Sequence, residues 1–432
     1  MKKIKYLSLI FCLLMLSSII TLTTQASSSQ MVQLASHGSI VYTQEQIFDL
    51  QIKRQFFTGY LGLSPAEYAQ ISDMWVGHYN RLWEVPQIHS IRPDQICLLY
   101  RNIREIWLPT HAEYLESEYN LFVDNGWLLK NAGGNYVVLA GGYSHMIDVG
   151  NADYQVWLAN WMLNYLDEYG ADGVYLDNCL PHWELSYGAD SIPINPRTGS
   201  AWESQEYTEA LKELVATIKE QIGSKIVFGN VLYSGKKFWR DSYHRFLVDF
   251  ILNSKIDGVL DEGWISRHSL ADWYPEDDWL KGVDEAVWIN DNFLSKGNKQ
   301  FMTISENAGM HYPIDVTALP PGVTKEQYVT YCYASQLLAA TYDGNYINFG
   351  QYMREDFPQS LFQIKLGNPI GSYYVITDTH LYVRDFSKGK VIVNPTSNEF
   401  IANLGDNYIT LEGSTVTSIA VPGHTALILR NS

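Results

Sequence analysis

A short apolar run, Val174–Leu176, lies between two glycines and two polar residues in the segment GADGVYLDN, residues 170–178. Short apolar runs bounded by turn residues are typical of buried parallel strands. Asp177 closes the run, so we expect its side chain to emerge where the strand ends. The pattern predicts a strand over 172–177 that delivers an acidic side chain to a working surface.

A second segment, IDGVLDEGW at residues 256–264, repeats this pattern. Alignment of the Asp-Gly pairs of the two segments places Glu262 opposite Asp177. Side chains alternate between the two faces of a strand, so equal offsets predict equal facing. Two acids would then end two similar strands and point in the same direction. The alternative interpretation is that each acid caps the helix that follows its strand.

Strand-like and helix-like patterns alternate along most of the chain. Eight strands are expected, at 55–60, 74–77, 96–100, 172–177, 225–230, 257–262, 300–306 and 345–350. Amphipathic helices are expected between them, notably at 153–169, 202–222, 278–295 and 324–341. This alternation predicts a (β/α)8 TIM barrel rather than an open doubly wound sheet. The first strand is not followed by a glycine-rich phosphate-binding motif, which further weakens a dinucleotide-binding interpretation.

The pattern changes in the last seventy residues or so, where only short strands separated by turn residues are found. These strands are expected at 373–376, 381–383, 390–393, 409–411, 417–420 and 426–429. They predict a small C-terminal antiparallel β-sandwich that packs on the barrel. We therefore expect a barrel domain over 27–358 and a β-sandwich domain over 359–432.

The N-terminus has the pattern of a secretory signal peptide. Three lysines within the first five residues precede an apolar run, Leu7–Ile20, and small residues follow at Thr24–Ala26. We expect residues 1–26 to be removed and the mature protein to be extracellular or periplasmic. No later segment is apolar over the length that a bilayer requires, so we expect no membrane insertion.

Charge and composition narrow the choice of partners. The formal net charge is −17, which repels nucleic acid and anionic lipid and fits a neutral or cationic substrate better. Aromatic residues make up 14% of the chain, and rings that the core does not use can stack on the apolar faces of sugars. The sequence contains neither a paired-histidine motif nor an acid-rich calcium loop, so we expect no metal and no cofactor.

Two acids across one barrel mouth suggest a specific chemistry. The active site of a TIM barrel lies at the carboxyl ends of its strands, and alternate strands contribute side chains to one layer. Asp177 and Glu262 end the expected fourth and sixth strands, so they can share a layer. Such a pair is typical of glycosidic bond cleavage, in which one carboxylate attacks or stabilises the sugar cation and the other protonates the leaving oxygen. Asp261 is a less favoured alternative acid, because its offset points it toward the helices.

Other polar and aromatic residues at or near the strand ends are candidate substrate contacts: Tyr60, His78, Arg101, Tyr143, Asn178, Asn230, Trp264 and Glu306. Each of them is also compatible with an ordinary position on the barrel rim, and Glu306 equally with a helix cap. By contrast, Asp172 and Asp257 begin their strands at the opposite face, where a structural role is expected.

Several segments resemble those of a known group of proteins. Asp148–Asn151 together with Gly170–Asn178 resembles secreted glycoside-hydrolase-like barrels that are distantly related to the α-galactosidase and α-amylase barrels. The tail segments 389–395, 411–413 and 422–429 are similar to the β-sandwich that ends many such enzymes. In these families the acid that ends strand four is the nucleophile, which implies this role for Asp177. The acid/base is on strand five or six, and strand five here ends in Asn230, so the resemblance implies Glu262.

The sequence therefore predicts a secreted glycoside hydrolase that acts on an oligo- or polysaccharide, with retention, through Asp177 as nucleophile and Glu262 as general acid/base. One alternative is a carbohydrate-binding protein that has lost catalysis on the same scaffold. Another is a hydrolase that acts on a non-glycosidic bond of amino-sugar polymers. Glu262 separates the first two readings, because a protein that only binds sugar has no need of an acid there.

Overall fold

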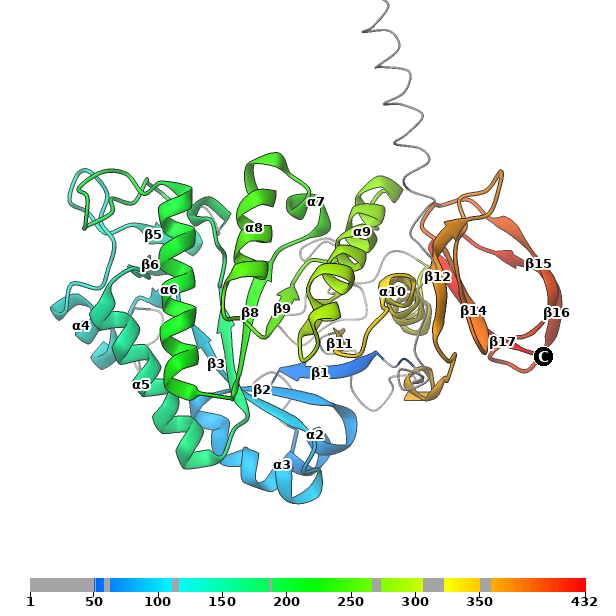
Figure 1. Cartoon of the computed structure of the whole chain (residues 1–432), viewed down its shortest axis with the longest axis horizontal. Coiled ribbons are helices and arrows are strands. Elements are labelled where there is room, and N and C mark those ends of the chain that lie inside the picture. The colour runs from blue at the N-terminus through cyan, green and yellow to red at the C-terminus, as the bar shows by residue number, and fades with distance from the viewer. Residues whose placement is uncertain are drawn as a thin grey trace, which may run out of the picture.

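A computed structural model describes residues 50, 52–57, 63–110, 116–185, 189–265, 273–305, 322–349 and 359–432 (Figure 1). The expected signal peptide, Tyr60 and Glu306 lie outside these residues. Among the described helices, none is both long enough and hydrophobic enough to traverse a lipid bilayer.

Eight parallel strands form a closed barrel in the order β1-β11-β10-β9-β8-β7-β3-β2. Their bounds are β1 (Lys53–Phe57), β2 (Met74–His78), β3 (Ile96–Asn102), β7 (Gly173–Asp177), β8 (Ile226–Leu232), β9 (Gly258–Asp261), β10 (Gln300–Ile304) and β11 (Asn345–Asn348). The barrel closes because β1 pairs in parallel with both β11 and β2. The predicted (β/α)8 barrel is confirmed, and β7 and β9 are its fourth and sixth strands.

Helices surround the barrel (Figure 1). They are α2 (Pro65–Ile71), α3 (Val85–Ile91), α5 (Ala152–Tyr169), α6 (Ser204–Ile222), α7 (Gly235–Phe238), α8 (Asp241–Asn253), α9 (Glu276–Asn292) and α10 (Lys325–Ala339). The predicted helix before β7 shows how the sequence sets the ends. The Asn151 side chain accepts a hydrogen bond from the Tyr154 N–H, and Gly170 ends α5 at φ 71°, a conformation that costs glycine little.

Inward-facing side chains fill the barrel and set the facing of each strand. The interior is packed by Met74, Val76, Leu98, Tyr175, Phe228, Leu260, Met302, Ile304 and Tyr346. On β3, Leu98 belongs to this interior and Tyr100 packs against it, whereas Leu99 belongs to the core between barrel and helices. Because facing alternates along a strand, Asn102 is expected to point inward and Arg101 outward.

A long insertion follows β3 and contains elements of its own. They are β4 (Glu105–Trp107), α4 (Glu116–Asp124), β5 (Val138–Leu139) and β6 (Ser144–Met146), and the strands form an antiparallel sheet in the order β4-β6-β5. The insertion starts beside the carboxyl end of β7, where the Ile103 N–H donates to the Asp177 carbonyl at 3.3 Å. It therefore places new side chains next to the end of the fourth barrel strand.

The C-terminal strands form one antiparallel sheet in the order β12-β13-β14-β17-β15-β16. They are β12 (Pro369–Val375), β13 (Tyr382–Phe386), β14 (Gly389–Asn394), β15 (Phe400–Ile409), β16 (Thr415–Val421) and β17 (Thr425–Asn431). The sheet curls strongly (Figure 1). Its apolar core is made of Leu381, Val383, Ile392, Ala402, Leu404, Val421 and Leu429. This confirms the expected small antiparallel β structure, and all six strands belong to a continuous hydrogen-bonded sheet.

A buried arginine fixes the C-terminal sheet to α10. Arg384 on β13 is 2% exposed, and its guanidinium donates to the carbonyls of Leu338 at 2.9 Å and Ala340 at 2.8 Å. The last carbonyls of a helix have no partner within the helix and carry a negative partial charge. One cation therefore satisfies the end of α10 and attaches the sheet to the barrel.

Candidate active site

Asp177, the last residue of β7, is surrounded by neutral hydrogen-bond donors. Its Oδ1 accepts from the backbone N–H of Asn178 at 2.9 Å and from Asn230 Nδ2 at 3.1 Å. Its Oδ2 accepts from the Tyr100 hydroxyl and, at 3.5 Å, from Asn102 Nδ2. In the described structure this carboxylate is thus held in place by amides and a phenol, and it makes no ion pair.

Asn230, on β8 between the two acid-bearing strands, joins Asp177 to Glu262. Its Nδ2 donates to Glu262 Oε2 at 2.8 Å as well as to Asp177 Oδ1 at 3.1 Å. The two carboxylate oxygens are therefore at most 5.9 Å apart, the sum of these two bond lengths. The structure brings together the two acids that the repeated strand pattern selects.

Strand register explains which neighbours reach Asp177. On β3, Tyr100 pairs with Tyr175 and Asn102 pairs with Asp177. Paired residues on parallel strands face the same side, so both β3 side chains point into the barrel mouth with Asp177. Sequence reasoning missed Tyr100 and Asn102. The alternation that starts at Leu98 was the signal that could have found them.

Arg101 faces the helices in this structure. Its guanidinium pairs with Glu118 and lies over the Trp161 ring of α5 at 4.9 Å from the ring centroid. The inward–outward alternation of β3 accounts for this placement, because Leu98 and Tyr100 point inward and Arg101 therefore points outward.

Trp264, another expected contact, is fully buried. It is 0% exposed, and its indole N–H donates to the Gly282 carbonyl of α9 at 2.7 Å. The chain has left β9 at Asp261, so the alternation of the strand no longer decides where this ring points. It fills the layer between barrel and helix instead.

Two of the expected substrate contacts, Asn178 and Asn230, hydrogen-bond to the acids. Asn178 is 9% exposed, and its Nδ2 donates to Glu105 Oε1 at 3.2 Å. Asn230 is 4% exposed and bridges Asp177 and Glu262. Both amides therefore support the carboxylates, which is a different role from the direct sugar contact that the sequence suggested.

His78 and Tyr143 lie where a substrate can reach them. His78 ends β2, and its ring centroid is 4.3 Å from that of Tyr100. Partial enclosure lowers the pKa of the His78 ring, while the negative charge of Asp177 opposes this shift. Tyr143 is 48% exposed in the insertion and packs beside Trp107, which is 43% exposed, with ring centroids 6.3 Å apart.

Glu105 is a third acid at this end of the barrel, and sequence reasoning did not find it. Its Oε1 accepts from Asn102 Nδ2 at 3.0 Å and from Asn178 Nδ2 at 3.2 Å, while Oε2 accepts from Ser144 Oγ at 2.6 Å. Burial raises the pKa of the Glu105 carboxyl, and the nearby charge of Asp177 raises it further. An irregular insertion gives no periodic signal for such a residue.

Asp261, the alternative acid, faces the helices. It is 0% exposed, its Oδ1 accepts from the Gly263 N–H at 3.0 Å, and it interacts with the Glu285 carboxyl of α9. Burial raises the pKa of the Asp261 carboxyl to about 6 and that of Glu285 well above its usual range. Glu262, and not Asp261, is the acid of this segment that contacts the Asn230 amide.

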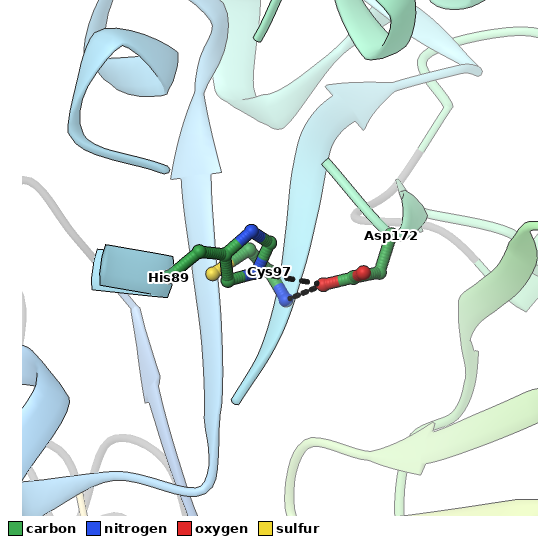
Figure 2. A group of neighbouring side chains, drawn as sticks. All are labelled: His89, Cys97 and Asp172. Carbon is green, nitrogen blue, oxygen red and sulfur yellow. Dashed lines mark hydrogen bonds and ion pairs between the residues drawn. The ribbon is translucent and has the colours of Figure 1, made fainter. Parts of the chain in front are cut away.

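In the described part of the chain, one cluster contains three side chains of the kinds that bind metals, and it lies at the opposite end of β7 from Asp177. His89, Cys97 and Asp172 place their ligand atoms within 4.8 Å of one another (Figure 2). His89 Nε2 lies 3.1 Å from the Gln95 carbonyl and 3.2 Å from Asp172 Oδ2, which fits a protonated nitrogen that donates. Burial raises the pKa of the Cys97 thiol, which disfavours the thiolate that a metal binds. These contacts indicate a structural role for the cluster, and we derive no metal chemistry from it.

Solved structures similar to this chain include several glycoside hydrolases. The glycoside hydrolase domain of PelA from Pseudomonas aeruginosa is 15% identical over 68% of this chain and 93% of that chain, with a TM-score of 0.40. An α-amylase from Geobacillus thermoleovorans, in complex with acarbose, is 11% identical over 88% of this chain and 96% of that chain, with a TM-score of 0.50. The second likeness shows the amylase-type barrel fold.

Sequence comparison identifies the family. Comparison with the curated proteins finds no matching sequence. The sequence model of hypothetical glycosyl hydrolase family 15, in contrast, matches residues 89–390, which is more than half of the chain. This span runs from α3 to β14 and includes Glu105, Asp177 and Glu262. The protein therefore belongs to hypothetical glycosyl hydrolase family 15 and is, by family, a glycoside hydrolase.

Proposed function

We propose that the protein is a secreted hydrolase that cleaves O-glycosidic bonds of an oligo- or polysaccharide with retention of configuration. Asp177 acts as nucleophile and Glu262 as general acid/base. The observation that carries this proposal is the Asn230 bridge, which limits the separation of the two nearest carboxylate oxygens to 5.9 Å. Retaining enzymes hold their two carboxyl groups about 5–5.5 Å apart, whereas inverting enzymes need roughly 6.5–9.5 Å for a water molecule.

The reaction would proceed in two steps. In the first, Glu262 donates its proton to the glycosidic oxygen while a carboxylate oxygen of Asp177 attacks the anomeric carbon, so that the glycosidic bond breaks and a glycosyl-enzyme ester forms. In the second, the ionised Glu262 takes a proton from water, the water oxygen attacks the same carbon, and Asp177 leaves as carboxylate. Asp177 attacks from the face opposite the leaving group and water then attacks from the face opposite Asp177, so each step inverts the carbon and the net result is retention.

Tyr100 supports the nucleophile in this scheme. Burial raises the pKa of the Tyr100 hydroxyl well above its usual range, and the charge of Asp177 raises it further, so the group stays protonated and donates to Asp177 Oδ2. A hydrogen bond to a charged acceptor is stronger than one between neutral groups. The phenol therefore holds the attacking carboxylate in one orientation.

The exposed pair Trp107 and Tyr143 supports a sugar substrate. Glu105 and Trp107 are two residues apart on β4, so they face the same side of the strand, while Ile106 between them is buried. Two residues of strand span about 6.6 Å, which is on the scale of one sugar ring. We propose that these rings stack on a sugar unit next to the one that is cleaved, with His78 contacting the substrate at the barrel mouth.

Product stereochemistry tests the mechanism directly. Neutral, acidic and amino-sugar polysaccharides with α- and β-linkages are first screened with the purified protein for released reducing ends. Proton NMR of the fresh products of an active substrate then follows the anomeric configuration, which is expected to match that of the bond cleaved. An initial product of opposite configuration would overturn the retaining mechanism. Binding of oligosaccharides with no cleavage in the screen would favour the non-catalytic alternative.

A further inference from the structure

Glu105 has no part in the two-step reaction, yet it contacts the groups that hold Asp177. Three donors saturate its carboxylate: two asparagine amides on Oε1 and the Ser144 hydroxyl on Oε2. Two acids this close together are unfavourable, since each charge raises the cost of ionising its neighbour. The hydrogen bonds of the Asn102 and Asn178 amides indicate what the second acid contributes.

We propose that Glu105 is a positioning residue for Asp177, acting through Asn102 and Asn178. The proposal rests on the proposed role of Asp177 as nucleophile. Both asparagines donate to Glu105 and to Asp177. The Glu105 carboxylate therefore holds the side-chain amide of each asparagine, while the Asn102 amide and the Asn178 backbone N–H reach Asp177. Loss of that anchor would leave Asp177 in place but free to rotate.

Asn102 is held at both ends of its amide. Its Oδ1 accepts the backbone N–H groups of Arg104 at 3.1 Å and Glu105 at 3.2 Å. Its Nδ2 donates to Glu105 at 3.0 Å and reaches Asp177 Oδ2 at 3.5 Å. The orientation of this amide is therefore determined, and Glu105 supplies the shorter of the two contacts that aim it at Asp177.

The backbone of Asn178 adopts a conformation that asparagine tolerates better than most residues other than glycine. Its φ is 53°, in the left-handed region that residues other than glycine rarely adopt. This conformation directs the Asn178 N–H at Asp177 Oδ1, 2.9 Å away, while the side chain is tied to Glu105 at 3.2 Å. The Glu105 contact therefore helps to keep the turn after the nucleophile in the conformation that Asp177 uses.

A carboxylate fits this position better than an amide does. All three of its partners donate, and an ionised carboxylate is the side chain that only accepts. Glutamine keeps the shape but has one accepting atom, so it could hold both asparagines only by turning its NH₂ toward Ser144, whose hydroxyl can then accept. Glu105→Gln should therefore preserve most of the positioning and remove the charge, whereas Glu105→Ala removes both.

The experiment compares these two variants with Asp177→Asn and with the control Glu118→Gln, which loses an acid that pairs with Arg101 on the outer side of β3. Misplacement of a reacting group by about 1 Å costs about 100-fold in rate. We expect Glu105→Ala to lower kcat by about 10–100-fold with KM changed little, and Glu118→Gln to match the wild type. Glu105→Gln should lose less, and the acidic limb of its kcat/KM profile should move to lower pH, because one negative charge beside Asp177 is gone.

Each contrary result has a separate meaning. Wild-type kcat in Glu105→Ala, with Asp177→Asn inactive, would overturn the positioning role and leave the proposed function standing. Wild-type rates in Asp177→Asn would instead refute the proposed function. A Glu105→Gln loss that disappears on aryl glycosides would make Glu105 the proton donor and overturn its role as a positioning residue. If Glu105→Ala does not fold by circular dichroism, the pH profile of Glu105→Gln decides alone, and an unmoved acidic limb counts against the proposal.

Discussion

The two ends of the barrel use acidic residues in opposite ways, and β7 carries an acid at each end. At its amino end Asp172 accepts the Cys97 N–H at 2.8 Å and the His89 ring at 3.2 Å (Figure 2). At its carboxyl end, among the described residues, Asp177 accepts only from neutral side chains and one backbone N–H. The same residue type on the same strand thus ties neighbouring strands together at one end and is held by neutral donors at the proposed catalytic end.

The amino-end arrangement recurs around the barrel. Asp257, which precedes β9, accepts the Val227 N–H at 3.0 Å and pairs with Lys219 Nζ at 2.6 Å. Asp73, which precedes β2, accepts the Arg54 N–H at 2.7 Å and pairs with the guanidinium of the same residue at 3.2 Å. Each acid thus joins a backbone N–H of an adjacent strand to a cation. An acid paired in this way is neutralised and stabilises the fold, in keeping with the stabilising role of this face in TIM barrels.

The carboxyl end pairs acids with amides instead. Asn230 is shared by Asp177 and Glu262, and Asn102 is shared by Asp177 and Glu105. Neutral donors fix the carboxylates without cancelling their charge, so the charge remains able to stabilise a developing sugar cation. The difference between the ends teaches that the partners of an acid, more than its position in the pattern, indicate its role.

The largest effect that this comparison predicts separates Asp177→Asn from Asp172→Asn. The first variant removes the proposed nucleophile and should lower kcat by at least about 100–1000-fold, the loss seen for a single electrostatic contact in an active site, while the thermal midpoint stays near that of the wild type. The second should keep kcat and lose about 1 kcal/mol of stability as its charged hydrogen bonds weaken. Steady-state kinetics and thermal unfolding of both variants measure the contrast. Loss of activity in an Asp172→Asn variant that is fully folded would contradict the predicted contrast.

The next effect is expected for Glu262→Gln and depends on the leaving group. General acid catalysis contributes about 10²–10⁴-fold, so polysaccharide cleavage should fall by that order. Aryl glycosides with acidic leaving groups need little protonation, and on them the loss in the first step should shrink. A series of aryl glycosides of increasing leaving-group pKa measures this, with Asp177→Asn as the control that should show no such recovery. A loss that is constant across the series would remove Glu262 from the role of acid.

The parts of the fold and the site that could be predicted from the sequence are those with a periodic pattern. The barrel, the order of its strands and the proximity of Asp177 and Glu262 follow from strand patterns of period 2, and these could be predicted. Tyr100 and Asn102 were within reach of the same rule, which also points Arg101 toward the helices. Glu105 could not be predicted, because its place depends on how the insertion folds back on β7. Trp264 could not be placed either, since it follows the end of β9 and packs in a space that the sequence does not describe.

Stability at different pH values gives the third prediction and sharpens the comparison. Burial by itself would raise the pKa of the Asp73 carboxyl, but the Arg54 N–H and guanidinium together with Arg92 hold it below its ordinary 3.8. Stability from this acid is present above pH 3.8 and is lost as the pH falls further, so Asp73→Asn should cost about 1–3 kcal/mol at pH 7 and less near pH 3.

The contribution of Asp261 to stability depends on pH in the opposite direction. Its pKa is raised to about 6, so its contribution is complete below pH 3.8 and is lost as the pH rises through 6. Asparagine mimics the protonated form and can donate to Glu285, so Asp261→Asn should gain about 1–3 kcal/mol at pH 8 and nothing near pH 3.5. Urea unfolding of both variants across pH 3–8 measures the two trends. Parallel trends would show that the partners of these two acids do not set their contributions.

The smallest expected effect concerns the aromatic pair at the carboxyl end, Trp107 and Tyr143. Contacts between an aromatic ring and the apolar face of a sugar are worth roughly as much as an aromatic pair, about 0.5–1.5 kcal/mol, which is about 2–10-fold in affinity. Trp107→Ala should therefore raise KM by that factor for oligosaccharides long enough to cover the rings. The value of kcat should hardly change, because Trp107 touches neither carboxylate.

Substrate length makes this last prediction specific. A short aryl glycoside that occupies only the cleaved position does not reach Trp107, so its KM should be unchanged in the variant. Tyr374→Ala is the matched control, since Tyr374 is also 43% exposed but lies on β12 of the C-terminal sheet, far along the chain from the insertion. Kinetics on a series of oligosaccharides should show a KM effect that begins at one chain length and then stays constant, because only one sugar unit meets the rings. An equal effect on the shortest substrate would place Trp107 at the cleaved unit, and equal effects of both variants would remove the aromatic pair from substrate binding.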